Sequence, residues 1–261
     1  MTTPSSSRRT PKRQRLDVAL VERGLAPSRE KARALILAAD VTVGGVAETR
    51  AGAPVSPETV LAIAAPARFV SRGGEKLDHA LEAFNIDVSR PVVMDVGAST
   101  GGFTDCMLQR GASRAYAIDV GYGQIASRLR DDSRVVVMER TNIRDLAALP
   151  ERPVLATIDT SFISLMTVLP AVMPLLAPGA DMVALVKPQF EAGRDEVKRG
   201  GVVRDPLVHA AVIGRVAWWC VNHGLRVRGV AMSPLLGPAG NREFFLWLRV
   251  DDAGGSPDSA D

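Results

Sequence analysis

Short apolar runs alternate with amphipathic segments along most of the chain, and this pattern predicts an α/β fold. Runs rich in β-branched residues have the length of buried strands at 91–96, 114–119, 135–138, 154–158, 182–186, 225–232 and 243–250. Helical patterns lie between several of them, at 75–84, 103–109, 165–176 and 206–223. Strands that alternate with helices predict a doubly wound sheet of the Rossmann type, whose ligand site lies at the carboxyl ends of the strands.

A smaller α+β unit is predicted before this sheet. An apolar helix face begins at Leu16, and Gly24 ends the helix. Ser28 is expected to cap a second helix that runs to Ala38. Two extended runs and the turn Gly44-Gly45 predict a small hairpin after it. A unit of about 55 residues is only marginally stable alone.

These patterns divide the chain into five segments. We predict a disordered basic tail over 1–12, the small unit over 13–64, a linker over 65–70, the large domain over 71–250 and a disordered tail over 251–261.

Residues 95–104 form a glycine-rich turn between the first predicted strand of the large domain and its helix. Such a turn presents backbone N–H groups and the positive end of a helix dipole to a ligand. Its glycine spacing differs from the dinucleotide motif G-x-G-x-x-G, and it lacks the Gly-Lys-Ser/Thr of a phosphate loop. Asp95 suits an ammonium group, and Asp119 ends the next strand, where a nucleotide ribose lies in such folds. The combination predicts S-adenosylmethionine as cofactor, whereas the glycines alone fit a packing turn equally well.

Four charged residues are expected at the same edge of the sheet. Asp159 and Lys187 follow predicted strands, and Glu243 opens the last one. Lys76 lies at the start of its predicted helix, where the helix dipole disfavours a cation, and it can reach the same edge. Each residue singly fits a surface charge, but together they predict a catalytic group beside the cofactor turn.

Positive charge is concentrated in the N-terminal quarter of the chain. Residues 1–66 contain ten Lys or Arg and six Asp or Glu, whereas the rest contains 22 and 23. This excess predicts a segment that contacts phosphates, although a solvated basic tail accounts equally well for residues 8–13.

The remaining composition is typical of a globular protein of the cytoplasm. The two cysteines, Cys106 and Cys220, form neither a disulfide framework nor a metal cluster, so we predict inert core thiols and no metal. The most apolar stretch, 165–186, is interrupted by three prolines and Asp181, which argues against a membrane span. No apolar leader follows the first residue, so a cytoplasmic location is expected.

The N-terminal unit resembles the S-four-type RNA-binding domain. The matching residues are Arg15-Leu16-Asp17, Gly24-Leu25, Ser28-Arg29, Ala32, Leu35-Ile36 and Val41-x-Val43-x-Gly45. The resemblance implies that basic residues of the paired helices grip structured RNA. By position these residues are Arg15, Arg23, Arg29, Lys31 and Arg33, to which we add Arg68 beyond the small unit.

The chain as a whole resembles the TlyA family, which joins an S-four-type domain to an FtsJ-like Rossmann methyltransferase. The resemblance is carried by 71–73, 76–77, 95–104, 119–124, 139–142, 161–164, 186–191 and 240–247. It implies 2′-O-methylation of cytidines in 16S and 23S ribosomal RNA, with an older label of haemolysin for some members. It places the family's Lys-Asp-Lys-Glu tetrad on Lys76, Asp159, Lys187 and Glu243. The expected cofactor-binding residues are Asp95, Gly97, Ala98, Ser99, Gly101, Gly102, Phe103, Thr104, Asp119 and Asn142.

The implied mechanism needs a base, because a ribose hydroxyl is a very weak acid. Our hypothesis is that Lys187, crowded by Lys76, removes the proton of the ribose hydroxyl and that Asp159 orients Lys187. Lys76 would stabilise the developing alkoxide, and Glu243 would position Lys76 or the ribose. The expected partner is ribosomal RNA or a ribosomal subunit, with no membrane and no DNA; the oligomeric state is open.

Three other functions stay open at this point. They are a methyltransferase for a small molecule or a protein, a membrane-active haemolysin, and an RNA-binding factor with an inactive cofactor site. The first leaves the basic N-terminal unit without a role, and the second requires a long apolar or lytic helix that the sequence does not show.

Overall fold

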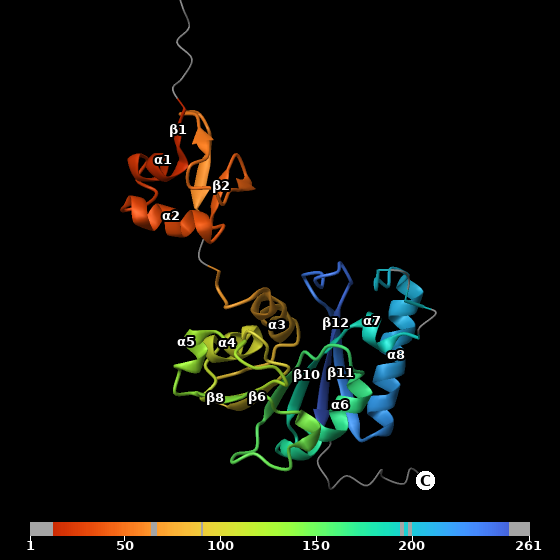
Figure 1. Ribbon diagram of the computed structural model, residues 1–261. Helices are drawn as coiled ribbons and strands as arrows, with labels where there is room; N and C mark the ends of the chain where they lie inside the picture. The colour runs from red at the N-terminus through yellow and green to blue at the C-terminus, as the bar shows by residue number, and fades with distance from the viewer. Residues whose placement is uncertain (1–12, 64–66, 90, 194–195, 198–199, 251–261) are drawn as a thin grey trace, which may run out of the picture. The chain divides into compact units, whose positions relative to one another are not determined.

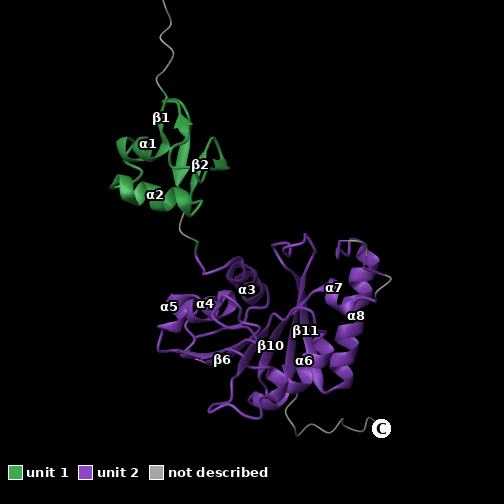
Figure 2. Cartoon of the chain, viewed as in Figure 1, with its two compact units in different colours: residues 1–67 green, residues 68–261 purple. Residues whose placement is uncertain are grey.

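A computed structural model describes residues 13–63, 67–89, 91–193, 196–197 and 200–250 of the chain. The chain forms two compact units, residues 1–67 and 68–261 (Figure 2). The predicted tails over 1–12 and 251–261 lie outside the described residues, as do residues 65 and 66 of the predicted linker.

Two helices and two small sheets make up the described part of the first unit. Its helices are α1 (Leu16–Glu22) and α2 (Arg29–Leu37), and its strands are β1 (Gln14–Arg15), β2 (Val41–Val43), β3 (Val46–Ala47), β4 (Pro54–Val55) and β5 (Leu61–Ile63). One sheet has the order β3-β2-β5, and β1 pairs with β4. The Ser28 hydroxyl accepts a hydrogen bond from the Lys31 amide at 3.2 Å, which confirms the predicted cap. The strands β1, β3 and β4 were not predicted, because two-residue strands leave no periodic pattern.

A seven-stranded sheet forms the centre of the second unit (Figure 1). Its strands are β6 (Val92–Val96), β7 (Arg114–Ile118), β8 (Val135–Met138), β9 (Leu155–Ile158), β10 (Asp181–Val186), β11 (Leu225–Met232) and β12 (Phe244–Val250). The order is β11-β12-β10-β9-β6-β7-β8, in which β12 is antiparallel to both neighbours and the other pairs are parallel. The seven predicted strands are therefore confirmed, and so is the α/β class.

Helices cover both faces of this sheet. The helices are α3 (Arg72–Ala83), α4 (Gly102–Gln109), α5 (Ser127–Arg130), α6 (Leu165–Val172), α7 (Pro188–Glu191) and α8 (Pro206–Asn222), with 3-10 turns at Ile143–Asp145 and Met173–Leu175. Alternate residues of β6 enter different cores: Val93 packs in the cluster of α3 and α4, and Met94 in that of α6 and α8. The sheet is thus doubly wound, as predicted.

The helix that carries Lys76 begins earlier than expected. It starts at Arg72, so Lys76 is in its second turn and not at its start. The helix dipole therefore does not disfavour Lys76, contrary to our expectation, because its effect is confined to the first turn.

The second unit also begins before the end of the predicted linker. Phe69 is buried in the core with α3 and α4, and the amide of Val70 donates to the Asp105 carboxylate at 2.7 Å. A Cβ at Gly74 would lie 2.2 Å from Cγ of Phe69, so the ring takes up the space that this glycine leaves. Residues 68–70 are therefore part of the second unit and not of a linker.

The buried cysteines agree with the prediction of core thiols. Cys106 and Cys220 are both free and buried, and desolvation raises the pKa of each thiol to about 12. In the described part of the chain, no helix combines the length and the apolar character needed to cross a bilayer.

Candidate active site

The site lies where the order of the sheet reverses. The chain leaves β6 toward β7 and β8, then returns to the other side of β6 to form β9 and β10. The Asp159 amide donates to the Val96 carbonyl at 2.9 Å, which brings the ends of β6 and β9 together. Gly97 has a φ of 86°, and a Cβ there would lie 2.5 Å from the Asp159 carbonyl oxygen. The close approach at this switch point therefore requires glycine.

Asp95 supports the glycine-rich turn from behind. Its side chain is fully buried, and Oδ2 accepts hydrogen bonds from the amide and the hydroxyl of Thr104 at 2.8 and 2.6 Å. Burial raises the pKa of Asp95 to about 7, although the two hydrogen bonds from Thr104 act to lower it. The nearby Asp159 carboxylate adds to the increase. Asp95 lines neither cavity of the site, so its predicted contact with a ligand's ammonium group does not fit this placement.

Two adjoining cavities open at this edge of the sheet, one of about 620 Å³ and the other of about 510 Å³. Both are lined by Gly97, Ser99, Asp159, Ser161 and Phe162. Of the predicted cofactor residues, the larger cavity also contains Ala98, Gly102 and Phe103, and the smaller contains Asp119 and Asn142. Gly101 and Thr104 line neither cavity; Gly101, with a φ of 92°, caps α4.

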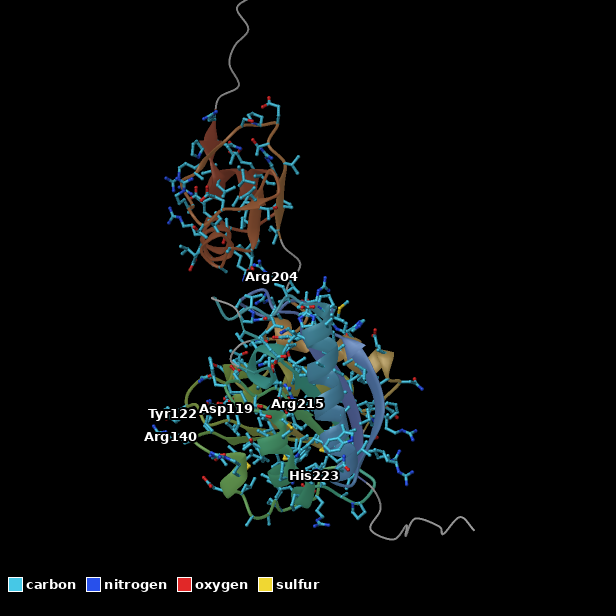
Figure 3. All side chains as sticks on the ribbon, turned by 90° about the vertical axis from the view of Figure 1, so that its right-hand side faces the viewer. Asp119, Tyr122, Arg140, Arg204, Arg215 and His223 are labelled. Atoms are coloured by element: carbon cyan, nitrogen blue, oxygen red, sulfur yellow. The ribbon has the colours of Figure 1, made fainter. Side chains whose placement is uncertain are left out.

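Asp119 holds the glycine-rich turn, which lines both cavities. Its carboxylate accepts hydrogen bonds from the amides of Ser99 and Gly121 at 2.8 and 2.7 Å. On the same side of the molecule, the Arg140 guanidinium stacks 4.1 Å from the Tyr122 ring centre (Figure 3). Asn142 accepts from the Arg144 amide at 3.1 Å and begins a 3-10 turn. The smaller cavity is therefore lined by polar groups whose positions are fixed by the backbone.

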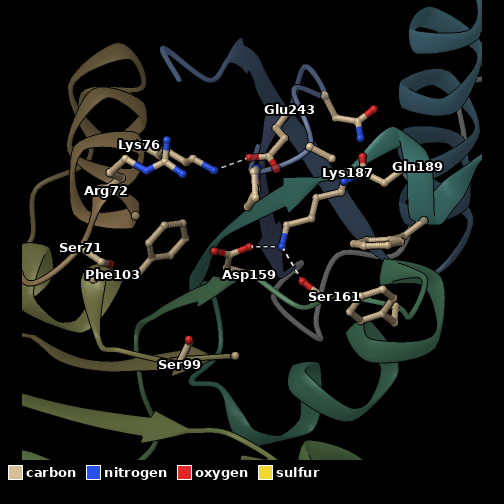
Figure 4. Close-up of a pocket in the computed structure, with 18 of the residues that line it drawn as sticks. Ser71, Arg72, Lys76, Ser99, Phe103, Asp159, Ser161, Lys187, Gln189 and Glu243 are labelled. Carbon is tan, nitrogen blue, oxygen red and sulfur yellow. Dashed lines mark hydrogen bonds and ion pairs between the residues drawn. The ribbon is translucent and has the colours of Figure 1, made fainter. Parts of the chain in front are cut away.

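The four residues of the predicted tetrad come together in the larger cavity (Figure 4). They form two separate ion pairs: Lys76 Nζ lies 2.5 Å from Glu243 Oε2, and Lys187 Nζ lies 2.7 Å from Asp159 Oδ1. The exposed fractions of the Lys76 and Lys187 side chains are only 10% and 11%. Each lysine contacts its own carboxylate. The group paired with Lys187 is therefore an acid, and not Lys76 as we expected.

Each ion pair depends on a local feature of the chain. Because β12 is antiparallel to its neighbours, Glu243 at its beginning reaches the edge where the parallel strands end. A Cβ at Gly237 would lie 2.4 Å from Glu243 Oε1, so this glycine leaves room for the carboxylate. Lys187 follows β10, and its Nζ also donates to the Ser161 hydroxyl at 2.9 Å.

Sequence reasoning did not assign roles to Ser161 or to an aromatic pair beside it. Phe162 is 90% exposed, has a φ of 63° and lies 4.9 Å from the Phe190 ring. Both rings line the larger cavity. An exposed phenylalanine with a left-handed backbone is unusual, and such strain is most often found at functional sites. The signal in the sequence was an aromatic residue three positions after a strand-end aspartate.

Three of the predicted RNA-binding residues converge on one carboxylate. The Nε atoms of Arg15, Arg29 and Arg33 donate to the fully buried Asp17 at 3.0, 3.2 and 3.1 Å. The Arg15 guanidinium, with those of Arg33 and Arg29, holds the pKa of Asp17 well below its usual range. Lys31 is exposed on the same helix as Arg29 and Arg33.

The other two arginines have structural partners. Arg23 donates to the carbonyl oxygens of Thr59, Ser56 and Pro57 at 2.5, 2.9 and 3.1 Å and so holds the turn before β5. Arg68 pairs with Asp78 within the second unit. Arg23 and Arg68 thus each have a partner within their own unit, and their RNA contacts stay a prediction.

Comparison with known proteins agrees with this geometry. Residues 69–250 match the FtsJ-like methyltransferase family, and residues 14–61 match the S4 domain. The chain is 49% identical over 243 residues to the 16S/23S rRNA (cytidine-2′-O)-methyltransferase TlyA of Mycobacterium tuberculosis, with 92% of this chain and 91% of that protein covered. The chain belongs to the TlyA family of FtsJ-like methyltransferases. The family suggested by the sequence motifs is thereby confirmed.

Solved structures extend the comparison. A hemolysin candidate from Streptococcus thermophilus, 41% identical to this TlyA-family chain, superposes with a TM-score of 0.72 and covers 93% of this chain and 90% of its own. A candidate S-adenosylmethionine-dependent methyltransferase from Listeria monocytogenes, 16% identical, gives a TM-score of 0.53 over 70% of this chain and 100% of its own. At that identity the second structure shows only that the fold is shared.

Proposed function

We propose that the chain transfers a methyl group from S-adenosylmethionine to the 2′-hydroxyl of cytidines in 16S and 23S ribosomal RNA. The observation that carries this proposal is the two lysine–carboxylate contacts beside the glycine-rich turn, one of them buried and the other partly buried. A base and a cation beside the acceptor oxygen would assist methyl transfer to a hydroxyl, and these lysines could supply both. The S4 domain and the activity for which the M. tuberculosis relative is named support ribosomal RNA as the substrate. Such a substrate implies action in the cytoplasm.

The residues of the two cavities fit S-adenosylmethionine. The smaller cavity offers the Asp119 carboxylate and the Asn142 side chain to ribose and base, and the larger offers Gly97 and Ser99 to the methionine part. The Thr160 hydroxyl, buried at the wall of the smaller cavity, has no hydrogen-bond partner among the described residues, as expected of a group that serves a ligand. When bound, S-adenosylmethionine supplies an electrophilic methyl group.

The lysines would handle the proton and the charge of the ribose hydroxyl. Lys187, in its neutral form, accepts the 2′-hydroxyl proton, while Asp159 and Ser161 fix the position of its Nζ. Lys76, held as an ammonium by Glu243, stabilises negative charge that develops on the ribose oxygen. Orientation of the hydroxyl in this buried site can supply about 7–11 kcal/mol of the barrier.

The test uses the purified full chain, unmethylated ribosomal subunits and radiolabelled S-adenosylmethionine. Label should enter 16S and 23S RNA, and mapping of 2′-O-methyl groups should find it on cytidines. A matched reaction with the Lys187→Ala chain should label the RNA at least about a hundredfold more slowly. Transfer to bases, to protein or to no acceptor in either subunit would overturn the proposal.

A further inference from the structure

Asp17 stands out in the first unit because a fully buried carboxylate faces three arginines. Arg15 donates to it through Nε and a terminal nitrogen at 3.0 and 3.2 Å, while Arg29 and Arg33 donate through Nε at 3.2 and 3.1 Å. Asp17 lies on α1, and the three arginines come from β1 and from two successive turns of α2, so the contacts join three elements of the unit.

The three guanidinium groups remain about half exposed although their common partner is buried. Arg29 and Arg33 each donate to Asp17 through Nε, so the end of each guanidinium group, with its two terminal nitrogens, can serve another acceptor. A guanidinium fork of this kind matches the two oxygens of a phosphate. The group carries a net charge of +2, since one carboxylate meets three cations.

Gly52 provides the space for this arrangement. A Cβ at Gly52 would lie 3.0 Å from a terminal nitrogen of Arg15 and 3.5 Å from its Cζ. The turn before β4 thus lies against the Arg15 guanidinium and limits its movement. A guanidinium fixed on one side by a carboxylate and on another by a turn loses less conformational entropy when it binds.

We propose that Asp17 is a positioning residue that holds Arg15, Arg29 and Arg33 as a preformed phosphate-binding surface for folded RNA. This inference rests on the proposed function, because it assumes that the first unit binds ribosomal RNA. Asp17 itself carries the wrong charge for RNA, so it acts only through the arginines. Its role is to fix the spacing of three cations and not to add attraction.

Removal of the carboxylate distinguishes a positioning role from simple electrostatic attraction, because the two predict opposite changes in RNA affinity. Asp17→Asn raises the net charge of the group by one, so attraction alone would tighten RNA binding. Loss of the positioning role would instead weaken RNA binding. Glu30→Gln is the matched control, because Glu30 is exposed on α2, the helix of Arg29 and Arg33, and its replacement adds the same charge without changing Asp17.

The experiment measures binding of the full-length variants to an in vitro transcript of 16S RNA over a range of salt concentrations. For Asp17→Asn we expect affinity to fall about tenfold and the slope of log K against log salt to fall by about 0.9 for each phosphate that the arginines no longer neutralise. Glu30→Gln should bind as the unaltered chain does or more tightly. In methylation assays, Asp17→Asn should raise KM for RNA and leave kcat unchanged.

A variant with unchanged net charge distinguishes loss of positioning from a folding defect. Replacement of both Arg29 and Arg33 by lysine keeps the net charge and changes only exposed side chains, but it removes the two Nε–H donors to Asp17. It too should lose affinity although it stays folded at the temperature of the binding assay, which its thermal unfolding curve checks. If this variant and Asp17→Asn bind as well as the unaltered chain, the positioning role is overturned and the proposed function stands. If the unaltered chain neither binds nor methylates ribosomal RNA, both proposals fail.

Discussion

Glu243 Oε2 lies 2.5 Å from Lys76 Nζ although 167 positions separate the two residues in the chain. Both side chains are almost fully buried, so each charge depends on the other for solvation. This contact connects α3 to the beginning of β12, the one antiparallel strand of the large sheet, and thereby fixes one wall of the larger cavity. It has a consequence for stability as well as for activity.

Glu243→Gln should destabilise the second unit by about 3–5 kcal/mol, because it leaves the Lys76 ammonium buried without a counter-charge. Urea unfolding measures this change. The double variant Lys76→Met with Glu243→Gln should recover most of the lost stability, since no unpaired charge remains. Methyl transfer should stay low in both, because the proposed stabilising cation is misplaced in one and absent in the other. Recovery of activity together with stability would contradict the proposed role of Lys76.

Lys187→Ala should lower kcat about 10²- to 10⁴-fold, the range that a general base contributes. RNA and S-adenosylmethionine should still bind, since the glycine-rich turn and the first unit are unchanged. Lys187→Arg is the informative control, because it keeps the positive charge beside Asp159 but cannot accept a proton. Single-turnover rates should be low for both variants. A normal rate for Lys187→Arg would assign this position an electrostatic role and not that of a base.

The sequence predicted the strands well and the side-chain contacts less well, for physical reasons. A buried parallel strand must be apolar along its whole length, so runs such as 154–158 are visible without a structure. The edge at which Asp159 and Lys187 gather follows from strand direction alone. Which carboxylate each lysine contacts depends on side-chain positions set by α3 and β12, and no local pattern encodes it.

Asp95 and Arg23 are two further residues whose side-chain partners the sequence does not reveal. A strand-end aspartate has the same sequence pattern whether it faces a ligand or, as here, Thr104 at the start of the next helix. A basic residue at the end of an amphipathic helix has the same pattern whether its guanidinium is unbonded or, like that of Arg23, donates to the carbonyl of Thr59. Residue type and spacing therefore predicted where charge gathers, but not which charges the fold uses for itself.

Asp95 should make stability depend on pH. Burial raises the pKa of Asp95 in the folded chain to about 7 from an ordinary value of 3.8, so the folded state favours the protonated form. Stability from this group is fully present below about pH 4 and is lost as pH rises through about 7. Comparison with Asp95→Asn cancels the contributions of other groups. Relative to Asp95→Asn, the unaltered chain should lose unfolding free energy as pH rises from about 4 to about 7; a constant difference between the two would show that Asp95 is ionised throughout.

Gly97→Ala should disrupt the site more than its backbone strain alone explains. The φ of 86° at Gly97 disfavours any other residue, and the added Cβ would lie 2.5 Å from the Asp159 carbonyl oxygen, so β6 and β9 must separate. Gly224→Ala is the matched control: its φ is 76°, but nothing lies within 4 Å of the added Cβ. Both variants should lose about 1 kcal/mol to strain, and Gly97→Ala should lose about 1–3 kcal/mol more from the clash. Isothermal titration with S-adenosylmethionine completes the comparison, since only Gly97→Ala should lose affinity; equal binding by the two variants would mean that the approach of Gly97 to Asp159 does not shape the cofactor cavity.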